Sequence, residues 1–249
     1  MSSYNRIVTR YENGITEVID YEKTIDVGYK RQVEEVAKVR SNGRVKLGRV
    51  KGKKSGFKEE NIFKNSVRAK KKIRSLCNNN AYILTKFITL TFADVFKEHD
   101  LLQANSIYSK FIKKLSYAVN QKIEYLTVPE LTKEGNIHYH MLCNLPYVDI
   151  EKIQEIWGYG ICYINKIEDI LNVSAYISSY VDKDFGKTFA GSRHFLKSKG
   201  IVYPESLKIQ REEDSNIYSI DNLVYKSFNN NFYCGDVVTK IYDKNSEWS

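Results

Sequence analysis

The sequence predicts an α+β fold: a split βαβ, ferredoxin-like antiparallel sheet flanked by helices. Two observations lead to this prediction. Between residues 81 and 184 the hydrophobic pattern switches between a period of two and a period of 3.6. The resulting order is strand, helix, strand, strand, helix, strand and a last helix, which is typical of the split βαβ arrangement. The chain has 249 residues, 42% of them hydrophobic and 28% charged, which is enough apolar surface for a core.

Each predicted element has its own signal. Residues 87–92 alternate cleanly, which predicts a strand with Ile88, Leu90 and Phe92 on one face. Residues 101–119 carry apolar side chains at helical spacing. The other elements follow the same two periods: strands over 123–130, 136–143 and 160–167, and helices over 149–157 and 169–184.

Positive charge is concentrated before these elements. The chain has a net charge of +9, but residues 31–75 alone hold 16 Lys and Arg against four acidic residues, a net charge of +12. Such an asymmetry indicates a polyanion as partner, although a solvated tail is an equally open interpretation. On a predicted helix over 62–76, a face that contacts phosphates is expected from Arg68, Lys70, Lys71, Lys72 and Arg74.

Two histidines and a carboxylate form the first candidate site. His138 and His140 are two apart on a predicted strand, so their side chains share one face. Glu130 ends the preceding strand, and pairing of Glu130 with His138 places Val128 opposite His140. Two imidazoles and one carboxylate suit Mn²⁺, Mg²⁺, Zn²⁺ or Co²⁺ and leave coordination positions open for a substrate. Two surface histidines and a solvated glutamate are the plainer alternative.

A second group lies on the predicted helix over 169–184. Tyr176, Tyr180 and Lys183 are spaced so that they share one helical face. A tyrosine hydroxyl is a weak nucleophile and needs a polarised phosphate and a nearby cation, which Lys183 could supply. The alternative is a tyrosine pair that packs against the sheet. Arg193 and Lys197 add positive charge that could hold DNA beside the tyrosines, or could be ordinary surface charge.

Several classes of protein are disfavoured. The single Gly-Lys-Thr, at 186–188, lacks the first glycine of a phosphate-binding loop, so an ATP-driven motor in this chain is not expected. The four cysteines form no CxxC pair, which excludes a zinc ribbon. No apolar run approaches a membrane span, and the first ten residues lack a signal sequence, so we expect a cytoplasmic protein without membrane contact.

These motifs resemble, in the same order, the three motifs of the HUH endonucleases. The strand at 87–92 corresponds to the first motif, His138-Tyr139-His140 to the second, and Tyr176-x-x-x-Tyr180-x-x-Lys183 to the third. Within that superfamily, the chain is most similar to rolling-circle replication initiators (Rep proteins) of the phage and Gram-positive plasmid type. The resemblance covers about residues 65–205.

The resemblance implies a site-specific enzyme that nicks and joins single-stranded DNA at a replication origin. Glu130, His138 and His140 would hold Mn²⁺ or Mg²⁺, Tyr180 would attack the phosphate to form a 5′-phosphotyrosine link, and Tyr176 would be a second nucleophile or position DNA. A separate host helicase and polymerase would be partners. The implied division is a basic DNA-binding extension over 1–75, an endonuclease domain over 76–205 and a C-terminal extension over 206–249.

Other functions stay open. Relaxases and transposases of the same superfamily use the same chemistry, but most relaxases carry the tyrosine before the histidines, and the transposases are usually shorter and lack the basic arm. A protein that binds DNA or RNA on a ferredoxin-like scaffold without catalysis is an alternative from another class. Metal-dependent cleavage of single-stranded oligonucleotides would separate the enzyme from the binding protein.

Overall fold

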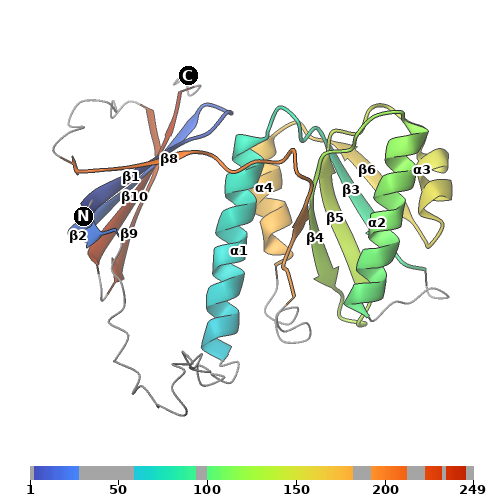
Figure 1. The fold of residues 1–249 in the computed structure, drawn as a ribbon, viewed down its shortest axis with the longest axis horizontal. Helices are drawn as coiled ribbons and strands as arrows, with labels where there is room; N and C mark the ends of the chain where they lie inside the picture. The colour runs from blue at the N-terminus through green and yellow to red at the C-terminus, as the bar shows by residue number, and fades with distance from the viewer. Residues whose placement is uncertain are drawn as a thin grey trace, which may run out of the picture. The chain divides into compact units, whose positions relative to one another are not determined.

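The strands in the described part of the chain form two five-stranded sheets, each in one of two compact units (Figure 1). The structure is a computed structural model, and it describes residues 3–27, 59–93, 100–181, 192–211, 222–231 and 234–244. The unit built on residues 59–205 carries the predicted site. None of the described helices is long and apolar enough to cross a bilayer.

The unit with the predicted site has the expected split βαβ fold. Its elements are α1 (Glu59–Asn79), β3 (Lys86–Thr91), α2 (Leu101–Ala118), β4 (Tyr125–Leu131), β5 (Ile137–Cys143), α3 (Ile150–Trp157), β6 (Cys162–Lys166), α4 (Ile170–Ser179) and β7 (Leu196–Lys197). The strand order is β6-β3-β5-β4-β7, with every neighbouring pair antiparallel. Counted along the βαββαβ segment, this is the order 4-1-3-2, so the predicted fold class is confirmed.

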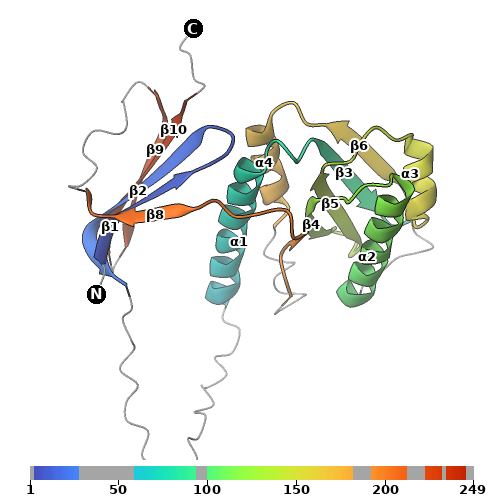
Figure 2. The same cartoon turned by 45° about the horizontal axis from the view of Figure 1, so that its top comes forward.

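Helices cover both faces of this sheet, and each face has its own core. On one face, α2 and α3 bury Tyr108, Phe111 and Trp157 against β3 and β5. On the other face, Ile73 of α1 and Ile177 of α4 are fully buried against β3, β4 and β5. Both views show α1 beside α4 on one side of the sheet and α2 on the other (Figures 1 and 2). The alternation of the strands therefore sorts their side chains between two cores.

Two helices differ most from their predicted bounds. Helix α1 begins at Glu59, before the predicted start at residue 62. Helix α4 ends at Ser179, although the periodicity predicts a helix to residue 184. The hydroxyls of Ser178 and Ser179 donate to the carbonyls of Ala175 and Tyr176, three residues back. Such bonds compete with the helical ladder, which accounts for the early end.

The last segment of this unit is tied to the end of α1. The buried Asn80 amide accepts a hydrogen bond from the Val202 N–H at 3.1 Å and donates to the Val202 carbonyl at 2.8 Å. Near β6, the chain passes so close to β3 that a Cβ atom on Gly160 would lie 2.2 Å from the Thr91 carbonyl oxygen.

The second unit is a sheet that joins the two ends of the chain. Its strands are β1 (Ser3–Arg10), β2 (Ile15–Asp26), β8 (Ser206–Ile209), β9 (Leu223–Asn231) and β10 (Gly235–Asp243), in the order β8-β1-β2-β10-β9. Asp20 lies inside this sheet, where Arg6 donates to it through two nitrogens at 2.6 and 3.2 Å and Lys240 at 3.1 Å. The Arg211 Nε also lies 3.9 Å from Asp20 Oδ1, so the buried carboxylate has three cations as partners.

The observed units differ from the predicted division at 75 and 205. Helix α1 belongs with residues 76–205, because its apolar face is part of their core. The first strands belong with the C-terminal ones, since β1 pairs with β8 about 200 residues away, as in Arg6 with Ile209. Pairing over that separation leaves no local signal in the sequence. Most of the basic segment, residues 28–58, lies outside the described residues.

Candidate active site

The predicted carboxylate and histidines lie in two neighbouring rows of the sheet, on the face that α1 and α4 cover. Strands β4 and β5 pair Glu130 with His138 and Val128 with His140. The sequence predicts only that these residues share one face, and the observed register places all three polar side chains there. Val128, the residue opposite His140, is buried and belongs to the hydrophobic core on this face of the sheet.

His140 is held at both ring nitrogens. Its Nε2 donates to the Glu130 carboxylate at 2.8 Å, and its Nδ1 lies 3.3 Å from the Thr89 hydroxyl on β3. The imidazole is buried, while about 30% of the Glu130 side chain stays exposed. A hydroxyl can donate or accept, so Thr89 can support either tautomer of the ring. His140 is therefore fixed in orientation by its neighbours.

Glu130 and His140 have the spacing of two ligands on one metal ion. Two donors bound at right angles at ~2.1 Å from an ion lie about 3.0 Å apart, close to the 2.8 Å observed. The donors would suit Mn²⁺ or Mg²⁺ with open positions, as the sequence predicts. Among the described residues, however, no three His, Cys, Asp or Glu side chains converge closely enough to hold a metal. Two of the three predicted ligands thus come together.

The third predicted ligand, His138, lies beside this pair. It is partly buried, and burial lowers the pKa of its imidazole, an effect that the negative charge of Glu130 opposes. His138 pairs with Glu130 across β4 and β5 and lies two residues from His140 on the same strand. A lowered pKa keeps the imidazole neutral near pH 7, which is the state that binds metals. His138 has the chemistry of a ligand, but among the described residues it does not form a three-ligand group with Glu130 and His140.

Tyr180 contacts the histidine, and Tyr176 contacts Tyr180. The ring of Tyr180 stacks on the imidazole of His140, with centroids 3.5 Å apart and planes 10° apart. The Tyr180 hydroxyl donates to the Tyr176 hydroxyl, and the two rings meet edge to face at 5.1 Å. Tyr180 lies in the turn after α4, while Tyr176 lies on the helix with 54% of its surface exposed. The sequence-predicted pair is therefore brought together beside His140.

The surroundings of Tyr180 keep its hydroxyl protonated. Burial raises its pKa above the ordinary value near 10, and so do the hydrogen bond to Tyr176 and the negative charge of Glu130. A neutral phenol is a poor nucleophile, so an attack by Tyr180 requires compensating positive charge in the site. The predicted source, Lys183, lies outside the described residues.

A cavity of about 380 Å³ opens beside the tyrosines, and its far wall is formed by residues that no sequence motif singled out. These are Tyr163, Asn165 and Lys166 of the edge strand β6. Tyr163 pairs with Thr89, so it continues the row of His140 across the sheet. Tyr163 and Asn165 are two apart on a predicted strand, and that spacing was the signal that could have identified them.

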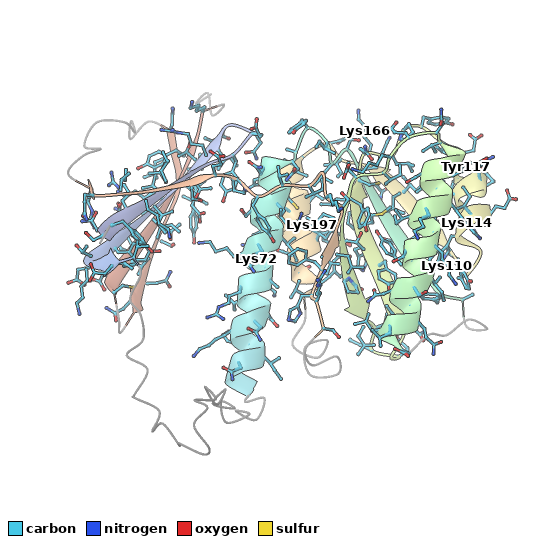
Figure 3. All side chains as sticks on the ribbon, in the orientation of Figure 1. Lys72, Lys110, Lys114, Tyr117, Lys166 and Lys197 are labelled. Carbon is cyan, nitrogen blue, oxygen red and sulfur yellow. The ribbon has the colours of Figure 1, made fainter. Side chains whose placement is uncertain are left out.

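The predicted DNA-binding residues of α1 differ in their surroundings. Arg68, Lys71 and Lys72 are exposed, and Lys70 is half-buried. Figure 3 shows Lys72 on α1. Arg74 is exposed, but its Nε donates to the Ser178 hydroxyl of α4 at 3.0 Å, so it also joins the two helices. Four of the five side chains thus present charge to solvent.

The two cations predicted after the tyrosines also differ. Arg193 is exposed. The Lys197 ammonium donates to the backbone carbonyls of Ile201 at 2.6 Å and Ser198 at 3.3 Å. These hydrogen bonds hold the ammonium against the backbone of its own segment.

The fold and this cluster define a split βαβ domain with a carboxylate, two histidines and two tyrosines on one face of its sheet. Residues 85–185 match the ORF2 family of replication-associated proteins. The match covers less than half of the chain, but it spans every one of these five residues. Over these residues the chain is thus similar to replication-associated proteins, and the predicted resemblance to Rep proteins is confirmed. The HUH assignment and the phage or plasmid type stay predictions.

The comparison with curated proteins and the comparison with solved structures gave no match.

Proposed function

We propose that the domain nicks and joins single-stranded DNA to initiate and terminate rolling-circle replication, with Tyr180 as the attacking residue. The observation that carries the proposal is the stacking of Tyr180 on His140, whose Nε2 faces Glu130. A nucleophile, an imidazole and a carboxylate meet there in a domain of the Rep type. If Tyr180 only packed against the sheet, apolar side chains would be expected under its ring, but the ring lies on His140, which is hydrogen-bonded to Glu130.

In the proposed reaction, the Tyr180 oxygen attacks the scissile phosphorus. The bond from phosphorus to the Tyr180 oxygen forms, and the bond from phosphorus to the 3′-oxygen breaks. The phenol loses its proton and the leaving 3′-oxygen gains one, which yields a 5′-phosphotyrosine link and a free 3′-hydroxyl. One phosphodiester replaces another, so the same site can reverse the reaction and rejoin strands.

The residues around Tyr180 have distinct roles in this proposal. A Mn²⁺ or Mg²⁺ ion bound by Glu130, His138 and His140 would supply Lewis-acid polarisation of the phosphate. Thr89 fixes the His140 ring through Nδ1. Tyr176 accepts the hydrogen bond of Tyr180 and so orients its hydroxyl. Lys183 would stabilise negative charge on the phenol oxygen.

The partners follow from the reaction. Single-stranded origin DNA is the substrate, and the exposed cations Arg68, Lys71 and Lys72 of α1 would contact its phosphates. A free 3′-hydroxyl is a primer for a separate host polymerase. The strand must be unwound by a separate helicase. We propose these two partners on that basis.

A cleavage assay tests the proposal. The full chain is incubated with each single strand of the DNA that carries its gene, with Mn²⁺ or with EDTA. The expected result is one cut site on one strand, extendable by a polymerase from its 3′-hydroxyl, and no cut in EDTA. Binding without cleavage on any strand would favour the alternative, a DNA-binding protein on a ferredoxin-like scaffold.

A further inference from the structure

We propose that the cavity beside the tyrosines binds one nucleobase of the single strand, adjacent to the phosphate that Tyr180 attacks, and so determines sequence preference. The inference rests on the proposed function and deepens it. It concerns residues of β6 that have no part in the proposed bond exchange.

The cavity has two different walls. One wall consists of His140, Tyr176 and Tyr180, the residues of the proposed reaction. The other consists of Tyr163, Asn165 and Lys166 on the edge strand β6. Since the cavity touches both, an occupant would lie directly next to the reacting phosphate.

The β6 wall has the chemistry that recognises a nucleotide. Tyr163 is 59% exposed and offers a ring on which a base can stack. Asn165 offers an amide that can donate to and accept from a base edge. Lys166 is exposed at the end of β6, where it can contact a phosphate (Figure 3). Within the described part of the chain, the side chains of Asn165 and Lys166 make no hydrogen bond or ion pair.

The sheet places Tyr163 and Asn165 on the face that carries the site. Tyr163 pairs with Thr89, and Asn165 pairs with Phe87, which also contacts His140 and Tyr176 through its ring. Cross-strand partners share a face, so Tyr163 and Asn165 lie on the face of His140. The row from His140 through Thr89 to Tyr163 runs across β5, β3 and β6 towards the open edge of the sheet.

The size of the cavity favours a single base. At about 380 Å³ it lies at the lower end of the range of ~300–1,000 Å³ for small-molecule sites. A base in a duplex is stacked and paired, so it cannot enter such a cavity unless it is unstacked. Single-stranded DNA offers bases that are free to enter.

The experiment selects sequences from a pool of random single-stranded oligonucleotides. The full chain is mixed with the pool in EDTA, so that no strand is cut, and the bound oligonucleotides are sequenced. We expect the wild type to enrich a short motif. Asn165→Ala should lose the preference at one position of that motif and keep the others. Tyr163→Ala should bind the selected motif about tenfold more weakly, whereas Tyr163→Phe should bind like the wild type.

Tyr117 provides a matched control. It is 89% exposed on α2, which covers the other face of the sheet (Figure 3). Tyr117→Ala should leave the motif and the affinity unchanged. Because Tyr163 and Asn165 are exposed at a sheet edge, their variants should unfold thermally like the wild type, which circular dichroism can check.

The outcomes separate this inference from the proposed function. If the wild type enriches no motif, or if Asn165→Ala and Tyr163→Ala keep the wild-type motif and affinity, the base-binding cavity is refuted. Cleavage by a protein with such an unchanged motif would leave the proposed function intact. Conversely, a motif that changes as expected, without cleavage of any selected strand in Mn²⁺, would retain the cavity and reject the nicking activity.

Discussion

The imidazole of His140 lies flat against the phenol ring of Tyr180, with ring centroids 3.5 Å apart. The same imidazole donates to Glu130 through Nε2 at 2.8 Å. His140 thus contacts both the proposed nucleophile and the proposed metal-binding carboxylate. Four elements meet at this one ring: β3, β4, β5 and the turn after α4.

Replacement of Glu130 should remove metal binding. Glu130→Gln keeps the shape of the side chain but removes the charge that a divalent cation requires. We expect the affinity for Mn²⁺ to fall at least roughly tenfold in isothermal titration calorimetry. Glu134→Gln is the control, since Glu134 is exposed on the loop of the same hairpin. Equal Mn²⁺ affinities for Glu130→Gln and the wild type would contradict the proposed metal site.

Neutralising the exposed cations of α1 should flatten the salt dependence of DNA binding. Deleting the whole basic segment would be a poor test, because Ile73 of the same helix is fully buried in the core. We expect the combined change of Arg68, Lys71 and Lys72 to Gln to lower the slope of log affinity against log salt by about 2.

Three lysines on α2 give a matched control for α1. Lys110, Lys113 and Lys114 are exposed on the helix of the other sheet face. Their change to Gln should leave the salt slope for single-stranded oligonucleotides as it is in the wild type. A slope that responds to the α2 change and not to the α1 change would reject α1 as the DNA-binding face.

Much of the domain could be predicted from local sequence. The strand over residues 87–92 and the hairpin of β4 and β5 follow alternation that is visible in the sequence, and the even spacing of Glu130 and His138 correctly predicts that they share one face. The prediction placed the end of α4 too late. The Ser178 and Ser179 hydroxyls donate to helix carbonyls and compete with the backbone hydrogen bonds, an effect that hydrophobic periodicity does not include.

The rest depends on contacts between distant residues. The sheet of β1, β2 and β8–β10 joins the two ends of the chain, and a local sequence pattern does not predict which distant strands pair. Likewise, Tyr163 and Asn165 become site residues only because β6 pairs with β3, which places them beside His140. The charge pattern of residues 31–75 predicts a polyanion as partner, but it does not predict the strands β1 and β2 that precede this segment in the chain.

Removing the Tyr108 hydroxyl should destabilise the site unit. The fully buried Tyr108 hydroxyl bonds to the Thr127 hydroxyl and contacts the Met141 sulfur. Tyr108→Phe leaves a buried Thr127 hydroxyl without this partner, which should lower the free energy of unfolding by about 1–3 kcal/mol. Urea denaturation measures the change. Tyr117→Phe, on the exposed face of the same helix, should stay within about 0.5 kcal/mol of the wild type; an equal loss in both variants would contradict the assigned bond.

The second unit should lose stability in acid through Asp20. Burial would raise the pKa of this carboxyl, but its bonds with Arg6 and Lys240 prevail and lower the pKa below its ordinary value of 3.8. The ionised form is therefore favoured in the folded state, so its contribution is complete above about pH 4 and is lost as the pH falls through the folded-state pKa.

Substitution of Asp20 tests this contribution. Asp20→Asn removes the buried counter-charge of Arg6 and should cost about 3–5 kcal/mol at neutral pH, with a weaker dependence on pH below about 4. Asp236→Asn, exposed in the same sheet, is the control and should behave like the wild type. Urea unfolding at a series of pH values gives both quantities. An acid-dependent loss in Asp20→Asn as large as in the wild type would reject Asp20 as its source.

The covalent adduct between the protein and DNA tests the central claim most directly. A single strand that the wild type cuts, labelled at its 3′ end, is incubated with Mn²⁺ and with wild type, Tyr180→Phe or Tyr176→Phe. Denaturing gels measure the labelled adduct, and mass spectrometry of the wild-type adduct locates the modified tyrosine. Both changes keep the ring, so the packing on His140 and Phe87 is preserved. The account predicts an adduct on Tyr180, none with Tyr180→Phe, and a first nick that survives in Tyr176→Phe. Adduct formation by Tyr180→Phe at near the wild-type rate, with its loss in Tyr176→Phe, would contradict it.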